Sequence, residues 1–125
     1  MAGDAVVRGL AVPGLQERLE SAFAGEVSDR LPRLLPAVAR LRRRGGDVSA
    51  ATVRTIVHEV HALATSAVVV GAHEAARSAR ACEHRLLAYI GGEAVPAVVV
   101  TEALEHLDRL LDSLSGWHPV AAGVA

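Results

Sequence analysis

The sequence predicts an all-α protein: an antiparallel four-helix bundle with a short additional helix on its N-terminal side. Apolar residues recur every three or four positions along most of the chain, which is the helical period. The chain is 51% hydrophobic but has only one Phe, one Trp and one Tyr, so Ala, Val and Leu must fill the core. Such a core suits closely packed helices. Val98–Val100 alone has strand character, and it has no convincing strand partner.

The length of 125 residues predicts a single domain. We expect residues 1–13 to form a flexible leader, 14–117 the helical bundle and 118–125 a flexible tail. The initial Met and the short segments beyond the bundle favour a free-standing module, and a fragment of a larger kinase is the alternative.

Prolines and glycines divide the N-terminal half of the bundle. A first short helix is marked by Leu15, Leu19, Ala22 and Phe23, and a second by Leu31, Leu34, Leu35, Val38 and Leu41. A break between Gly25 and Asp29 would place Pro32 in a first turn, where proline is tolerated. Pro36 still predicts a kink, and Gly45-Gly46 the end of this helix.

Two central helices follow. Ser49 or Thr52 can cap the first, whose apolar stripe extends from Val53 to Val70. Gly71 ends it, and a second stripe, which includes Cys82, continues to Ile90 before Gly91-Gly92. Cys82 is therefore expected in the core.

A last helix is expected over about 97–115, after Pro96. Leucines at helical spacing support it, and we expect Trp117 to fold back onto the end of the bundle.

Composition excludes several classes of function. The net charge is −1, with 13 basic and 14 acidic residues, so no overall field attracts nucleic acid or an anionic membrane. The single cysteine excludes an internal disulfide and favours a reducing compartment. No apolar run approaches the length of a membrane span, and the N-terminus lacks the features of a signal peptide. We expect a cytoplasmic protein, while the sequence indicates no oligomeric state.

His61 is the candidate reactive residue. It lies one step beyond Val60, at the edge of the apolar stripe, so its ring should reach solvent. His61 and Glu83 are each eleven residues from Ala72, or roughly 16 Å along their helices, and should meet across a hairpin. A carboxylate that accepts from one imidazole nitrogen fixes the tautomer and leaves the other nitrogen as a nucleophile.

The segment HALATSAVVVGA, residues 61–72, resembles the active-site signature of histidine phosphotransfer (HPt) domains. The matching residues are His61, Leu63, Ser66, Ala67, Gly71 and Ala72. The following segment ACEHRLLAYIGGE looks like the helix of chemotaxis-type kinases in which a glutamate bonds the phosphorylated histidine, and Glu83 falls at that position.

This resemblance implies a phosphorelay carrier. His61 would accept a phosphoryl group from a histidine kinase or from a response-regulator aspartate and pass it on, with Glu83 orienting the ring. Such a carrier has no ATP site and no cofactor of its own, and the magnesium belongs to the response regulator. The implied docking surface consists of His58, Ala64, Thr65, Ser66 and Val68.

Two positions depart from the family pattern: Ala64 stands where the family has a lysine, and Thr65 where it has a glycine. A lysine would attract the phosphoryl group as a point charge, unless Arg54 or another base substitutes. The alternative function is therefore a pseudo-HPt module that docks receiver or kinase domains without carrying phosphate. A bundle used only for dimerisation is a third hypothesis. His58 and His61 alone, three residues apart, are weak evidence for a metal site.

Overall fold

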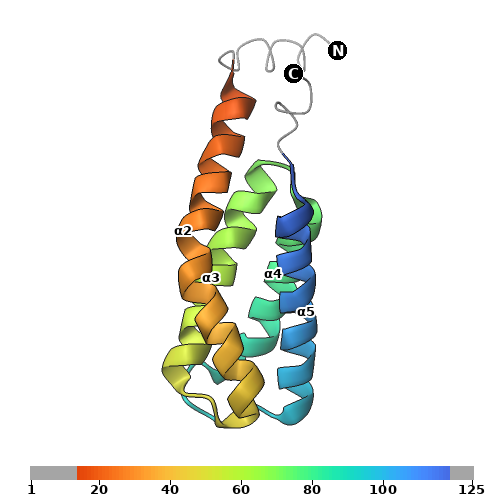
Figure 1. Cartoon of the computed structure of the whole chain (residues 1–125). Helices are drawn as coiled ribbons and strands as arrows, with labels where there is room; N and C mark the ends of the chain where they lie inside the picture. The colour runs from red at the N-terminus through yellow and green to blue at the C-terminus, as the bar shows by residue number, and fades with distance from the viewer. Residues whose placement is uncertain (1–13, 119–125) are drawn as a thin grey trace.

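The computed structural model describes residues 14–118, and every regular element among them is helical (Figure 1). The predicted leader, 1–13, and all of the predicted tail except His118 lie outside these residues. Four long helices pack into a bundle. They are α2 (Leu15–Arg44), α3 (Ala50–Val69), α4 (His73–Leu86) and α5 (Ala97–Gly116), with short 3-10 turns η1 (Gly45–Asp47) and η2 (Leu87–Tyr89).

The first helix differs from the prediction. The expected break between Gly25 and Asp29 is absent, and residues 15–44 form the single helix α2. A glycine within a helix costs only about 1 kcal/mol relative to alanine, which tertiary contacts readily outweigh. Here Arg30, directly after the expected break, bonds Glu26 within it and also reaches Glu59 of α3, so these contacts favour continuous helix.

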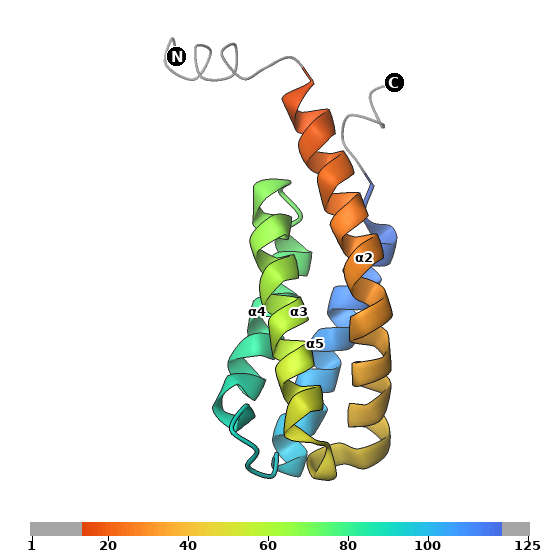
Figure 2. The ribbon, with the colours of Figure 1, turned by 90° about the vertical axis from the view of Figure 1, so that its left-hand side faces the viewer.

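Pro32 and Pro36 therefore lie inside α2 rather than in a first turn. Both are exposed and four residues apart, so they share the solvent side of the helix. Water can satisfy the carbonyls that lose their helical donors there, and helices with such defects bend. Figure 2 shows α2 changing direction near its middle, as a proline kink predicts.

Helix α3 begins and ends where the sequence predicts. Ser49 is the N-cap, and its hydroxyl accepts a hydrogen bond of 3.2 Å from the backbone N–H of Thr52. At the other end Gly71 adopts a φ of +78°, a backbone conformation that residues other than glycine rarely adopt. The N–H of Ala72 then bonds the carbonyl of Ala67, at 2.9 Å. The resulting turn is short, and α4 begins at His73 and packs on α3 (Figure 2).

Helix α4 is shorter than its apolar stripe suggests. It ends at Leu86 and is followed by η2, so Ile90 lies outside the helix and is 37% exposed, not part of the core. Helix α5 begins directly after Pro96, as predicted, and Arg85 of α4 pairs with its Glu102 at 2.7 Å.

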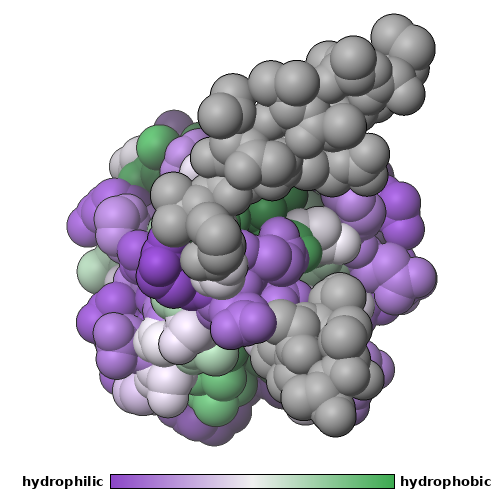
Figure 3. Space-filling model, turned by 90° about the horizontal axis from the view of Figure 1, so that it is seen from above, coloured by the Kyte–Doolittle hydropathy of each residue, from purple (hydrophilic) through white to green (hydrophobic). Residues whose placement is uncertain are grey.

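Trp117 folds back as expected. Its ring meets Phe23 edge-on, with centroids 5.0 Å apart, and so joins the end of α5 to α2. The first turns of α2 extend past the turn between α3 and α4 (Figure 1). Seen from this end, hydrophilic residues cover much of the visible surface, and hydrophobic ones show among them near the middle and at parts of the edge (Figure 3).

The core consists of aliphatic residues from all four helices, with Phe23 as its one fully buried aromatic ring among the described residues. Three alanines of α4, Ala75, Ala76 and Ala79, are buried. Small residues let α4 approach its neighbours closely. Cys82 is fully buried, as predicted, and burial raises the pKa of its thiol to about 12.

A buried carboxylate joins α2 to α3. The Glu59 side chain is only 3% exposed and accepts hydrogen bonds from Arg30, at 2.9 Å, and Arg33, at 3.1 Å. Glu26 bonds both Arg30 and the hydroxyl of Ser66. Burial alone would raise the pKa of Glu59, but the two guanidinium groups outweigh it and the pKa falls below its ordinary value of 4.5.

Replacing Glu59 by Gln should lower the free energy of unfolding by about 1.5–3 kcal/mol, because two charge-assisted hydrogen bonds lose their anion. Urea titration measures this loss. Glu105→Gln, at an exposed position on α5, is the matched control and should change stability by no more than about 0.5 kcal/mol. Equal effects of the two variants would contradict the assignment.

The same pair predicts an acid dependence. Because the pKa of Glu59 is lower folded than unfolded, its contribution is complete above about pH 4.5 and is lost as the pH falls through the folded value. Wild type should therefore lose stability on acidification more steeply than Glu59→Gln. Parallel pH profiles in urea titrations would refute this.

Cys82 should resist thiol reagents in the native protein, because it is buried and its thiol pKa is about 12. An aromatic disulfide reagent at pH 8 should react slowly with native protein and rapidly in strong denaturant. Rapid reaction without denaturant would show that α4 opens readily.

Candidate functional site

The solvent face of α3 carries a stripe of exposed side chains, spaced three and four residues apart. They are Arg54, His58, His61, Thr65 and Val68. His61 lies near the middle of α3, and its side chain is 66% exposed. The apolar residues on either side of it, Val60 and Leu63, are buried in the core and hold the backbone beneath it.

Glu83 of α4 meets His61 across the helix interface, as the count about Ala72 predicts. The Nδ1 atom of His61 and Oε2 of Glu83 are 2.8 Å apart. An ionised carboxylate only accepts hydrogen bonds, so Nδ1 carries the proton and donates it. This tautomer leaves the Nε2 atom with its lone pair. The arrangement provides an oriented imidazole that can act as a nucleophile or as a proton acceptor.

A hollow of about 520 Å³ lies beside this pair. Its lining comes from α3, α4 and the segment after η2: Arg54, Val57, His58, His61, Glu83 and Ile90. The Arg54 side chain donates a hydrogen bond of 3.3 Å to the carbonyl of Ile90, which holds the guanidinium at the edge of the hollow. Because α4 ends at Leu86, before Ile90, the chain can turn and bring Ile90 to the hollow.

The predicted docking residues differ in their accessibility. His58, Thr65 and Val68 are exposed, as a docking surface requires. Ala64 is only 2% exposed and belongs to the core, so its inclusion in that surface was wrong. Its position three residues after His61 places it next to the buried stripe of α3.

Ser66 and Thr65 both use their hydroxyls within the protein. Ser66 is half-buried and donates to Glu26 of α2, away from the hollow. The Thr65 hydroxyl donates to the backbone carbonyl of His61, at 3.1 Å. The Thr65 hydroxyl proton is therefore not free to bond an approaching molecule.

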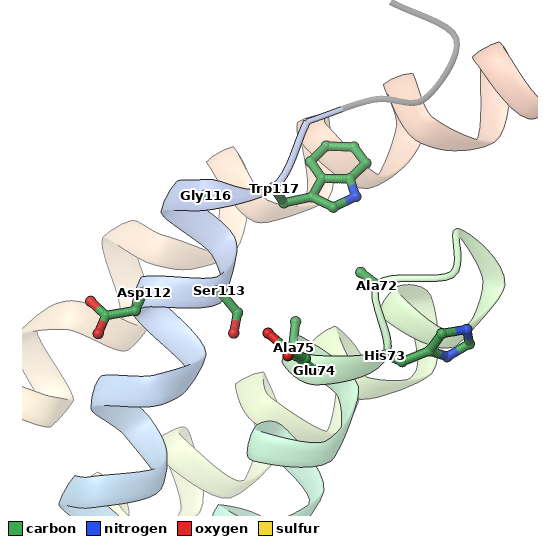
Figure 4. Close-up of a pocket in the computed structure, with 8 residues that line it drawn as sticks. All are labelled: Ala72, His73, Glu74, Ala75, Asp112, Ser113, Gly116 and Trp117. Carbon is green, nitrogen blue, oxygen red and sulfur yellow. The ribbon is translucent and has the colours of Figure 1, made fainter. Parts of the chain in front are cut away.

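A second hollow, of about 420 Å³, lies at the end of the bundle where Trp117 folds back (Figure 4). His73, Glu74 and Asp112 contribute polar side chains, but these point in different directions and the figure shows no convergence on one point. This hollow lacks a paired imidazole, so the His61 site is the stronger candidate for chemistry.

Among residues 14–118, no group of three or more His, Cys, Asp or Glu side chains is arranged to hold a metal ion. In the same part of the chain, no helix combines the length and apolar character needed to cross a membrane.

The sequence patterns do not indicate two features of the site. The apolar spacing places Ile90 on a helical core stripe, but in the structure it lines the hollow. Glu59 was not recognised as a buried anchor, yet its spacing from Ile56 and Leu63 is i+3 and i−4, which places it on the buried side of α3. A carboxylate at such a position, with arginines on the preceding helix, is the signal that would have indicated it.

Comparison with known proteins leaves the family open: no family model, no curated protein and no solved structure matches this chain.

Removing the Glu83 carboxylate should change the tautomer of His61. In wild type the Nδ1–H form should dominate at alkaline pH, and Glu83→Ala should shift the population toward the Nε2–H form. Long-range ¹H–¹⁵N NMR spectra of the imidazoles distinguish the two. His84, exposed on the same helix, is an internal reference that should not change. A wild-type His61 with the tautomer ratio of His84 would contradict the assigned hydrogen bond.

Proposed function

We propose that this protein is a histidine phosphotransfer module, built as an antiparallel four-helix bundle, in which His61 carries a phosphoryl group between a histidine kinase and a response-regulator aspartate. The observation that carries the proposal is the 2.8 Å contact between His61 Nδ1 and Glu83. The resemblance of residues 61–72 to the phosphotransfer signature supports it independently.

The chemistry follows from the tautomer. The Nε2 lone pair attacks the phosphorus of an aspartyl phosphate on the receiver domain. An N–P bond forms while the aspartate P–O bond breaks, and the aspartate carboxylate leaves with the electron pair. The imidazole becomes positively charged. Its proton stays on Nδ1 and remains hydrogen-bonded to Glu83, whose negative charge stabilises the imidazolium. The reverse step returns the group to an aspartate.

The surroundings of His61 suit such a transfer. The ring is 66% exposed in the middle of a helix, so the active site of another protein can close over it. A bundle core and a short turn hold both partners of the pair, and rigid elements position reacting groups more accurately than loops do. The exposed apolar side chain of Val68, on the same face, adds contact area for a partner.

A second candidate function is a docking module that binds receiver or kinase domains without taking phosphate. It is favoured by Ala64 and Thr65, which replace the lysine and glycine of the family signature. The methyl group of Thr65 lies one turn from His61, where it adds bulk to the contact surface.

The two functions are separated by phosphoryl transfer from a panel of receiver domains, phosphorylated beforehand with radiolabelled acetyl phosphate and magnesium. The wild-type protein should gain an acid-labile, base-stable label. His61→Gln should reduce the label to background, because its side chain provides no nucleophilic nitrogen. His84→Gln, which changes an exposed histidine of α4, is the matched control and should retain the label.

Binding of a receiver without label on the wild type would favour the docking module. Neither binding nor label across the panel would overturn both functions. Label that persists in His61→Gln would move the site to another histidine.

A further inference from the structure

The hollow beside His61 contains one fixed positive charge, the guanidinium of Arg54. We propose that Arg54 is the residue that binds the phosphoryl oxygens on His61, in place of the lysine that this chain lacks beside its histidine. The inference rests on the proposed function and identifies the group that stabilises the phosphorylated form.

The sequence leaves arginine as the source of such a charge. The chain contains no lysine, so all 13 of its Lys and Arg residues are arginines. Position 64, where the family signature has its lysine, holds an alanine that is only 2% exposed. A cation for the phosphoryl group must therefore come from another position, and Arg54 is the one arginine among the residues that line the hollow.

The helix geometry places Arg54 and His61 on the same face. They are seven residues apart, or two turns and roughly 10.5 Å along α3, with His58 between them. Side chains on a helix tilt toward its N-terminus, so the His61 ring leans along α3 in the direction of Arg54, while the Arg54 side chain extends to the Ile90 carbonyl at the edge of the hollow. Both residues line the hollow, so a phosphoryl group on Nε2 that occupied it would approach the guanidinium.

The Arg54 guanidinium is held in position but has donors to spare. Within residues 14–118 its side chain makes one hydrogen bond, from Nη1 to the Ile90 carbonyl. Four of the five N–H donors of an arginine side chain then remain for phosphoryl oxygens, and its planar fork matches their geometry. The carbonyl contact also limits the freedom that Arg54 loses when it binds.

Arg80 is the main competitor for this role. It is exposed on α4, one turn before Glu83, but it is not among the residues that line the hollow. Its charge and helical setting resemble those of Arg54, while its position differs. Arg80→Gln is therefore the matched control for Arg54→Gln.

The experiment phosphorylates the protein chemically with phosphoramidate, which requires no partner protein. The ³¹P resonance that is absent from His61→Gln identifies phospho-His61, and its shift is followed against pH. A nearby guanidinium favours the doubly ionised phosphoryl group. The titration midpoint should thus rise in Arg54→Gln by about 0.2–0.7 pH units, as expected for one exposed ion pair. Arg54→Lys should stay near wild type.

The outcomes are distinct. An unchanged midpoint in Arg54→Gln, an equal rise in Arg80→Gln, or an Arg54→Lys variant that behaves like Arg54→Gln would overturn the role of Arg54. Absence of a phospho-His61 resonance from wild type would overturn both the role and the proposed function. A chemically phosphorylated His61 that exchanges with no receiver domain would overturn the proposed function alone.

Discussion

The buried carboxylate of Glu59 is the constraint on which the geometry of the site depends. Two guanidinium groups of α2 hold it, and a carboxylate this deeply buried is stable only when paired. Fixing Glu59 toward α2 fixes the rotation of α3. His61 follows two residues later, roughly 200° around the helix, and must therefore face away from α2 toward solvent and α4. An alternative rotation of α3 would separate Glu59 from both arginines and bury an imidazole.

The rotation of α3 alone does not bring Glu83 to His61. The position of α4 along the axis of α3 must also be fixed. The turn at Gly71 does this, because its positive φ allows a connection of few residues between the helices. The buried alanines of α4 then permit close approach. A longer turn or bulkier residues at this interface would separate Glu83 from His61 and leave the tautomer unspecified.

The helical class and the turn at Gly71 follow from local patterns, and the contact of His61 with Glu83 from their equal spacing about that turn, so the sequence predicts them. Ser49 is one of the two caps that the sequence allows for α3. The sequence does not predict the continuity of α2. Gly25, Pro32 and Pro36 are local signals for a break or kink, and contacts with α3 outweigh the break. The position of Ile90 differs from the prediction for a similar reason, because the apolar spacing continues past Leu86 although helix α4 ends there. Hydrophobic period indicates which residues are buried more reliably than where an element ends.

The burial of Ala64 shows what replaces the lysine of the HPt signature that residues 61–72 resemble: a small side chain packed in the core. A lysine at this position would carry its aliphatic stem along the core before its charge reached solvent near His61. Alanine instead allows close packing there, and the positive charge at Arg54 lies on the N-terminal side, next to Ile90. Under the proposed function, a receiver domain that docks here meets a basic edge on one side of the imidazole and the apolar Thr65 and Val68 on the other. A receiver domain would then bind well only if the part of its surface that contacts Thr65 and Val68 is apolar. This requirement would reduce the number of receiver domains that the module can bind.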